Sequence, residues 1–223
     1  MCGRFSLHIP MTELIEYFRL AGGIPFDRRY NIAPSEKIPV IRRQAGERRL
    51  DLARWGLVPH WAKDAKIGYR MINARAETVA SKPSFRGPFH NQRCIIPASG
   101  FYEWQKTDRG RRPYHVFRSD GAPLALAGLW DRWENPDDPG EAVISCTIIT
   151  TAANDPVSKL HDRMPAILEP KEFAPWLDPD RSRGDLLALL HPAAEGVLDL
   201  HPVSDYVNKP GHEGEECIRA EAS

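Results

Sequence analysis

The sequence predicts an α+β fold: a single domain with a mostly antiparallel, barrel-like β-sheet core and a few short flanking helices. Three observations predict it. Short runs of alternating apolar and β-branched residues recur along the chain, the 20 prolines exceed what helix bundles tolerate, and no βαβ rhythm or fixed-period repeat is visible. The 223 residues fit one domain and can bury a sizeable core. We expect one domain over residues 1–223, with a peripheral C-terminal tail at about residues 205–223.

Seven segments have the composition and alternation of strands: Cys2–His8, Lys37–Ile41, Leu50–Leu57, Cys94–Trp104, Tyr114–Phe117, Leu124–Trp130 and Val143–Thr151. Apolar residues at helical spacing predict three helices, Thr12–Leu20, Pro170–Leu177 and Gly184–His191. Pro170 suits the first turn of its helix, where a missing N–H costs nothing. The loop Glu134–Glu141 is rich in Pro, Asp and Gly, which predicts a surface insertion and not a domain linker.

The composition is that of a globular protein, with 42% hydrophobic and 27% charged residues. The formal net charge is zero, so a nucleic-acid partner would need a local basic surface. Two stretches are basic, Ile41–Arg54 and Lys106–Arg118, whereas the C-terminal tail is acidic. Solvated hairpin faces explain both basic stretches equally well.

The four cysteines, Cys2, Cys94, Cys146 and Cys217, form no C-x-x-C pair and have no metal-ligand spacing. Cys94 and Cys146 lie in apolar runs and are expected to be buried as small hydrophobic residues, and Cys217 has no assignable role. With no H-x-x-x-H pattern and no Gly-rich phosphate loop, we expect no metal and no cofactor. The N-terminus lacks a signal-peptide pattern and no apolar run is long enough to span a bilayer, so we expect a cytoplasmic protein without a membrane partner.

The second residue is the most informative one. Initiator methionine is commonly removed before a small residue, and loss of Met1 would leave Cys2 with a free α-amine beside its thiol. An α-amine has a pKa of about 8, so much of it is unprotonated near neutral pH and can form a Schiff base with an aldehyde. The neighbouring thiol can then add to the imine carbon and close a thiazolidine ring. Many proteins begin Met-Cys by chance, so Cys2 becomes a site candidate only together with other motifs.

Cys2 lies in the first of six separated segments, which are, in order, MCGRF, RYNIAP, RWGLVPHWA, MINARAET, CIIPASGFYEW and TTAANDPVSKLHDRMPAIL. In that order they resemble the SOS response associated peptidase (SRAP) family, the abasic-site processing proteins. The resemblance runs from Cys2 to about Leu168, roughly three quarters of the chain. It implies a monomeric sensor that binds single-stranded DNA and forms a thiazolidine crosslink with an abasic site through Cys2, shielding the lesion in the DNA damage response. It also implies association with the nucleoid when DNA is bound, and the family name adds peptidase (hydrolase) chemistry, with a minor lyase activity, to the expectations.

The resemblance assigns four catalytic residues. Cys2 is the crosslinking nucleophile, and Asn73 holds the reacting sugar and amine in place. Glu103 is the acid/base carboxylate that assists opening of the deoxyribose ring, and His161 moves protons around the imine. A carboxylate and an imidazole are suitable proton donors and acceptors near neutral pH. Taken alone, Glu103 could be a solvent-facing strand residue, His161 a helix-end histidine and Asn73 a turn residue.

Charge and aromatic residues indicate where DNA would lie. Three arginines lie within two residues of a predicted catalytic side chain and are expected to bind phosphates beside the lesion: Arg4, Arg75 and Arg163. Four aromatic residues are candidates to stack on bases or hold the strand open, with core packing as the open alternative: Trp55, Trp61, Phe85 and Trp104. Three cations around a Pro- and Gly-broken segment could line a DNA channel: Lys82, Arg86 and Arg93.

Three other functions stay open on the sequence. An N-terminal-nucleophile amidohydrolase also uses a freed cysteine, although Arg4 and Phe5 replace the small apolar residues favoured there, and ammonia release from glutamine would identify it. The second is an autoprotease that removes its own short leader. The third is a non-catalytic module that binds single-stranded DNA, and a Cys2→Ser substitution would leave such binding intact.

Overall fold

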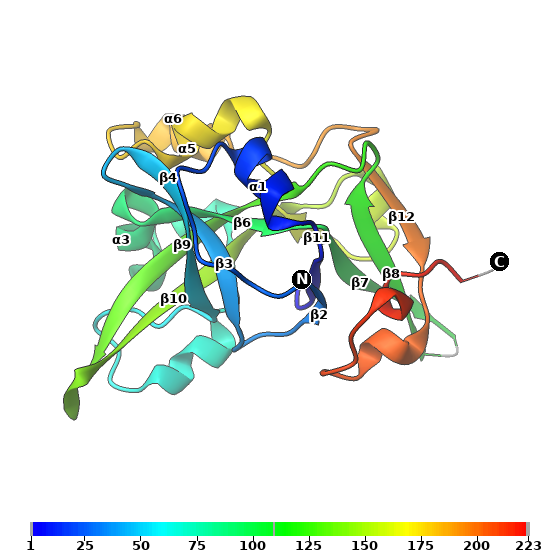
Figure 1. The fold of residues 1–223 in the computed structure, drawn as a ribbon, viewed down its shortest axis with the longest axis horizontal. Helices are drawn as coiled ribbons and strands as arrows, with labels where there is room; N and C mark the ends of the chain where they lie inside the picture. The colour runs from blue at the N-terminus through cyan, green and yellow to red at the C-terminus, as the bar shows by residue number, and fades with distance from the viewer. Residues whose placement is uncertain (1, 109, 222–223) are drawn as a thin grey trace.

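Five strands close into a barrel, at the left in Figure 1, and a second five-stranded sheet lies to its right. The computed structural model describes residues 2–108 and 110–221. Around the barrel the order is β10-β4-β3-β6-β9, and β9 pairs with β10 to close the ring. The strands are β3 (Lys37–Gln44), β4 (Glu47–Trp55), β6 (Arg93–Ala98), β9 (Leu124–Asn135) and β10 (Asp138–Ala152). All of these pairings are antiparallel except that of β10 with β4.

The second sheet has the order β12-β8-β7-β1-β2, and all its pairings are antiparallel. Its strands are β1 (Phe5–Leu7), β2 (Arg29–Ile32), β7 (Gly100–Thr107), β8 (Gly110–Arg118) and β12 (Leu198–Pro202). The chain crosses from the barrel to this sheet at Ser99, whose Oγ accepts hydrogen bonds from the backbone N of His8 (2.8 Å) and of Ile9 (3.3 Å). The predicted strand Cys94–Trp104 is therefore two strands that belong to two sheets.

The predicted fold class is confirmed, and the barrel and the second sheet share one core. Phe5 of β1, Phe101 of β7 and Val116 of β8 lie on the inner face of the second sheet and are fully buried. The ring of Phe5 meets Trp55 at the end of β4 edge-on, with centroids 5.2 Å apart. The segment that leads into β1 is consequently held against one end of the barrel.

Short helices cover the top of the molecule as drawn in Figure 1. Those that correspond to predicted helices are α1 (Met11–Phe18), η2 with α5 (Pro170–Glu172 and Phe173–Leu177) and α6 (Arg183–Ala188). The unpredicted ones are η1 (Ala65–Arg70), α2 (Ala76–Val79), α3 (Pro83–Asn91), α4 (Asp155–Ser158), η3 (Asp205–Asn208) and η4 (Glu215–Cys217). Tertiary packing stabilises α3 despite Gly87 and an internal Pro88, because Phe85 and Phe89 are buried. In the described part of the chain, no helix has the length and apolar character to cross a membrane.

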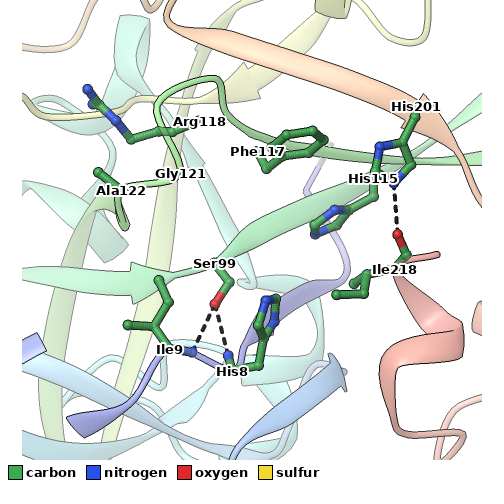
Figure 2. Close-up of a pocket in the computed structure, with 10 residues that line it drawn as sticks. All are labelled: His8, Ile9, Ser99, His115, Phe117, Arg118, Gly121, Ala122, His201 and Ile218. Atoms are coloured by element: carbon green, nitrogen blue, oxygen red, sulfur yellow. Dashed lines mark hydrogen bonds between the residues drawn. The ribbon is translucent and has the colours of Figure 1, made fainter. Parts of the chain in front are cut away.

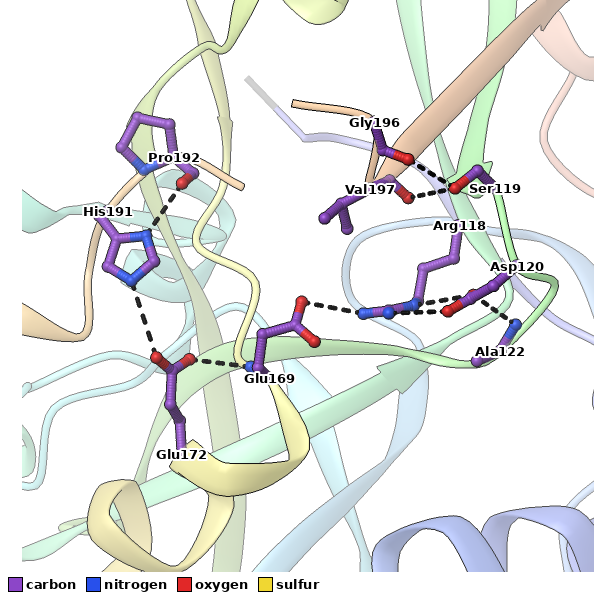
Figure 3. A network of polar contacts seen from close by, with 10 residues as sticks. All are labelled: Arg118, Ser119, Asp120, Ala122, Glu169, Glu172, His191, Pro192, Gly196 and Val197. Atoms are coloured by element: carbon purple, nitrogen blue, oxygen red, sulfur yellow. Dashed lines mark hydrogen bonds and ion pairs between the residues drawn. The ribbon is translucent and has the colours of Figure 1, made fainter. Parts of the chain in front are cut away.

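Figure 3 shows how the end of β8 is tied to the C-terminal third of the chain. Arg118 pairs through Nη2 with Asp120 (2.9 Å) and through Nη1 with Glu169 (3.0 Å). The hydrogen bonds from Arg118 lower the pKa of Asp120 to about 2. Ser119 Oγ donates to the backbone O of Gly196 at 2.6 Å. The turn after β8 is thus held by the contacts of Arg118 with Glu169 and of Ser119 with Gly196.

The C-terminal segment is packed and not peripheral, which corrects the expectation for residues 205–223. Val207 and Cys217 are fully buried in a small cluster against β7. Glu213 accepts two hydrogen bonds of 2.6 Å from β2. Scattered apolar residues among the acidic ones do this packing, so the composition alone did not reveal it. The last two residues lie outside the described part of the chain.

The predicted surface insertion Glu134–Glu141 is instead the hairpin that joins two long barrel strands. β9 continues to Asn135, β10 begins at Asp138, and these two residues are paired. The register shifts between Asp138 and Ala142, as happens where a bulge absorbs extra residues. The Pro- and Asp-rich composition therefore marks a tight turn and an irregular ladder.

A cavity of about 260 Å³ opens on the face of the second sheet that is turned away from the core (Figure 2). His8, His115 and His201 line it. Nε2 of His115 lies 3.1 Å from Ser6 Oγ, and a Cβ atom at Gly100 would approach that Nε2 to 2.3 Å, so the close packing requires glycine. Burial, reinforced by the charges of His201 and His8, lowers the pKa of His115 to about 3.

We expect His115 to make the protein less stable in mild acid. Its pKa in the folded chain lies below the value of about 6.5 for an unfolded histidine, so between the two values only the unfolded chain binds the proton. The effect is absent above about pH 6.5 and grows as the pH falls, lowering the free energy of unfolding by about 2 kcal/mol at pH 5. Urea unfolding at neutral pH and at pH 5 measures it, with His115→Gln as the comparison. An unchanged pH dependence in this variant would contradict the assignment.

Candidate active site

Asn73 holds the N-terminal segment through Cys2. Cys2 precedes β1 and is fully buried, and Met1 lies outside the described residues. Asn73 begins β5 (Asn73–Arg75), which runs parallel to β10 with Asn73 opposite Ile148. Its Nδ2 donates a 2.8 Å hydrogen bond to the backbone O of Cys2. Its Oδ1 is buried and finds no hydrogen-bond partner among the described residues, so the amide keeps an acceptor for one further group.

Strand pairing places Glu103 beside the same segment. β1 and β7 pair with Phe5 opposite Phe101. One residue further, Tyr102 N donates to Arg4 O at 3.0 Å, so the residues before Arg4 run alongside Glu103. Side chains alternate along a strand, so Glu103 shares the inner face with Phe101, and it is only 3% exposed. A solvent-facing strand carboxylate is thereby excluded.

Burial and neighbouring charges shift the pKa values of the Glu103 carboxyl and the Cys2 thiol. Burial raises the pKa of the Glu103 carboxyl, and the positive charge of His161 partly opposes this shift. Burial also raises the pKa of the Cys2 thiol far above its usual range, and the negative charge of Glu103 raises it further. Glu103 therefore interacts electrostatically with both Cys2 and His161. A carboxyl with a raised pKa is better matched to proton transfer near neutral pH.

His161 lies in the turn between α4 and β11 (Arg163–Pro165), with about a third of its side chain exposed. The backbone N of Arg163 donates to His161 Nδ1 at 3.0 Å, which requires an unprotonated Nδ1 and places the proton of the neutral ring on Nε2. The same Nδ1 lies 2.8 Å from Asp162 Oδ1, a contact that is favourable when the ring is protonated. The two contacts exclude each other, and each suits one protonation state.

The structure brings together all four residues that the sequence predicts to be catalytic. They come from the segment before β1, from β5, from β7 and from the turn before β11. A hydrogen bond joins Asn73 to Cys2, and charge interactions join Glu103 to Cys2 and to His161. Their chemical roles stay predictions.

The three arginines predicted to bind phosphate differ in their contacts. Arg163 donates to both carboxylate oxygens of Glu77 (2.6 and 2.9 Å) and lowers the pKa of that carboxyl. Nη1 of Arg4 donates to Asn31 Oδ1 (2.6 Å) and to a backbone carbonyl of η3 (3.0 Å). Arg75 is exposed. Two of the three predicted phosphate-binding arginines are thus engaged by the protein, and Arg75 is the exposed one.

The stacking role predicted for Trp55 and Phe85 is wrong, because Trp55 is fully buried and Phe85 is 5% exposed. Trp55 Nε1 donates to the backbone O of Ile72 (2.9 Å), so both the ring and its polar atom are satisfied inside the core. Trp61 is 51% exposed and presents a ring to solvent. Trp104 is half-buried, and its Nε1 donates to Asn208 Oδ1 at 2.7 Å.

The three cations predicted to line a DNA channel also differ in their exposure to solvent. Arg93 is 5% exposed, and its guanidinium donates to four backbone carbonyls, including that of Trp176 at 2.6 Å. Lys82 and Arg86, at the start of α3, are exposed. Of the three, Lys82 and Arg86 can meet a ligand.

Replacing Trp55 by alanine should lower the free energy of unfolding by about 3–5 kcal/mol, because it removes a fully buried indole and leaves a cavity. Trp61→Ala is the matched control and should change the free energy by less than about 0.5 kcal/mol. Urea unfolding measures both. Equally small losses in the two variants would show that the indole of Trp55 is not a core element.

Asn31 is a supporting residue that the sequence did not single out. It is fully buried on β2, accepts from Arg4 and donates through Nδ2 to the backbone O of Val207 (3.1 Å) and of Lys209 (3.2 Å). It thereby connects the segment after Cys2 to the C-terminal segment. The one available signal was an asparagine inside the RYNIAP motif.

Comparison with known proteins identifies the family of the chain. The sequence model of the SOS response associated peptidase (SRAP) family matches residues 1–210. The chain is 42% identical to the abasic site processing protein YoqW of Bacillus subtilis (strain 168), over 99% of this chain and 100% of that protein. It is 34% identical to the abasic site processing protein HMCES of Gallus gallus, over 85% of this chain and 65% of that protein. A solved structure of a protein from Bacteroides thetaiotaomicron matches with a TM-score of 0.91 and 26% identity, covering 99% of this chain and 100% of that chain.

A barrel joined to a second five-stranded sheet is the fold that the chain shares with the solved structure from Bacteroides thetaiotaomicron. The chain belongs to the SRAP family.

Proposed function

We propose that this protein processes abasic sites in DNA by capturing them covalently through Cys2. The observation that carries the proposal is that Asn73 and Glu103 interact with Cys2 and that His161 interacts with Glu103, from three separate segments of the chain. The name of the relatives, abasic site processing proteins, supports the choice of substrate. Removal of Met1 supplies the α-amine that the chemistry needs.

The first step exposes the aldehyde. An abasic deoxyribose is mostly a closed hemiacetal, and opening it moves a proton from one oxygen to another. Glu103 suits this transfer, because its burial raises its pKa towards neutrality.

The second step joins amine and aldehyde. The α-amine of Cys2 attacks the aldehyde carbon, a C–N bond forms, and water leaves to give an imine. The departing hydroxyl needs a proton, which His161 can supply from its protonated form. Asn73 holds the backbone of Cys2, and its buried Oδ1 can accept a hydrogen bond from the amine.

The third step closes the ring. The raised pKa keeps the thiol of Cys2 protonated, so it is a weak nucleophile until the imine is in place. Glu103 then accepts the thiol proton, the sulfur bonds to the imine carbon, and the proton passes to the former imine nitrogen. The three steps together release one water and involve no net oxidation or reduction.

We place the DNA strand across exposed side chains. Arg75 lies two residues after Asn73 and is exposed, and Trp61 and Arg86 are exposed as well. A cation beside the reacting residue positions a phosphate, and an exposed ring can stack on a base of a single strand. The proposal therefore assigns single-stranded DNA as the bound form.

Arg75→Ala should flatten the dependence of DNA affinity on salt. A phosphate contact on a single strand contributes about −0.7 to the slope of log affinity against log salt, so the slope should fall by about that amount. Arg132→Ala, which removes an exposed arginine from the β9 hairpin, should leave the slope unchanged. A titration series with intact single-stranded oligonucleotide measures both. Equal slopes for Arg75→Ala and wild type would place the strand elsewhere.

The function itself is tested by incubating the protein with a uracil-excised single-stranded oligonucleotide, followed by denaturing electrophoresis. We expect a shifted band that survives denaturation. A variant that retains Met1 should give none, because its α-amine is not on the cysteine. Failure of the Met1-free protein to form the band would overturn the proposal.

A further inference from the structure

The first basic stretch of the sequence forms two like-charged pairs on neighbouring strands. β3 and β4 pair with Arg42 opposite Arg49 and with Arg43 opposite Arg48. Like charges directly opposite one another destabilise a sheet. Arg42 is neutralised by an ion pair with Asp51, whereas Arg48 forms no ion pair with any described residue. In the second pair Arg43 lies 3.6 Å from Asp178, so Arg48 is the member of that pair without a carboxylate partner among the described residues.

Arg43 and Arg48 lie at the mouth of the barrel. Ile41 and Leu50, paired with each other two residues further along the strands, are buried in the core, so the arginine pair continues the same inner face where the barrel opens. Arg48 is seven residues from Trp55, about 24 Å along an extended strand. This mouth is thus the end of the barrel away from the candidate active site.

Two adjoining cavities open at this mouth and share Arg43 and Gly46. One, of about 500 Å³, is lined by Arg48, Arg181 and residues of α5. The other, of about 320 Å³, extends to Trp130. Together they form one groove, which we call the arginine groove and define by Arg43, Arg48, Arg181 and Trp130.

Positive charge exceeds negative charge in the arginine groove. Burial lowers the pKa of Arg48, and the nearby charge of Arg19 lowers it further, which shows two cations crowded together. The carboxylate among the lining residues of the two cavities is Asp178, 3.6 Å from Arg43. An anion bound in the groove would relieve the repulsion between the arginines.

We propose that the arginine groove binds the phosphodiester backbone of nucleic acid, as a second contact site apart from the reacting cysteine. Guanidinium forks match phosphate oxygens, and the half-buried Trp130 at one end carries the Arg42 guanidinium 4.3 Å from its ring centroid, which adds a further cation there. Two adjoining cavities, of about 500 and 320 Å³, offer room for more than one phosphate group. The choice of nucleic acid as the polyanion rests on the proposed function. A strand bound both in the arginine groove and at the active site would bind more tightly than one bound at the active site alone.

The test compares Arg43→Gln/Arg48→Gln with Lys106→Gln/Arg111→Gln. The control pair also consists of two opposed cations, on the exposed β7–β8 hairpin, so both variants lose the same charge. Affinity for a long intact single strand is measured across a salt series. We expect the groove variant to flatten the slope of log affinity against log salt by about 1.4 and the control to leave it unchanged. Equal slopes for the two variants would overturn the groove.

Two further measurements distinguish the loss of a DNA contact in the groove from a disturbed fold and from a failed active site. The urea midpoint of the groove variant should stay close to that of wild type, because removing the repulsion between Arg43 and Arg48 offsets the loss of the contact between Arg43 and Asp178. Weaker binding would then not reflect misfolding, and a midpoint far below that of wild type would contradict the crowding of cations on which the groove rests. Crosslinking of a short abasic oligonucleotide should proceed at the wild-type rate in the groove variant. If the wild-type protein formed no crosslink at all, the proposed function would fail, while the affinity measurements with the intact strand would still decide the groove.

Discussion

Cys2→Ala is expected to eliminate the denaturation-resistant adduct with abasic DNA. The variant keeps an α-amine and can still form an imine, but it has no sulfur to close the thiazolidine ring, and an imine hydrolyses during denaturation. Denaturing electrophoresis of the Met1-free protein with a uracil-excised strand measures the effect.

Cys2→Ser serves as the matched variant, since its hydroxyl is a far weaker nucleophile of similar size. Both variants should form a stable complex when borohydride reduces the imine, and both should bind intact DNA as wild type does. A stable adduct at the wild-type level in Cys2→Ala, without reductant, would exclude the thiazolidine.

Glu103→Gln is expected to slow crosslinking by about 10²–10⁴-fold, the range typical of a lost general acid or base. The substitution keeps the shape of the buried side chain and removes its ability to exchange a proton. Noncovalent affinity for DNA should not change, because Glu103 is 3% exposed and carries no charge that attracts phosphate. Single-turnover rates at saturating DNA give the effect on the chemistry.

The control is Glu172→Gln, which removes another largely buried carboxylate, in η2, and should leave the rate unchanged. A wild-type rate in Glu103→Gln would remove this residue from the mechanism. A loss of DNA affinity equal to the loss of rate would point to a disturbed fold.

The barrel strands could be predicted because their alternation is a local property. The segments around β3, β4, β9 and β10 alternate long enough to be recognised, whereas β5 and β11 have three residues each and acquire their conformation from pairing with β10. The change of sheet at Ser99 could not be predicted, since it depends on which distant strands pair with either side.

The candidate site was predictable in its residue types and not in their surroundings. Motifs name Cys2 and Glu103, but the burial of Glu103 follows from the pairing of β1 with β7, almost a hundred residues apart. The pairing of Arg163 with Glu77 likewise joins distant segments, and this contact is what removes Arg163 from the exposed cations. Trp55 shows the same limit, since its position at the end of β4 fits both a core residue and an exposed platform until the second sheet is in place.

The most direct test of covalent capture is the intact mass of the product. The Met1-free protein is incubated with an abasic single-stranded oligonucleotide, heated without any reductant, and analysed by mass spectrometry with fragmentation. We predict a mass equal to that of protein plus DNA less one water, with the modification on Cys2. A product seen only after borohydride reduction, or a modification on a lysine instead of Cys2, would contradict the account.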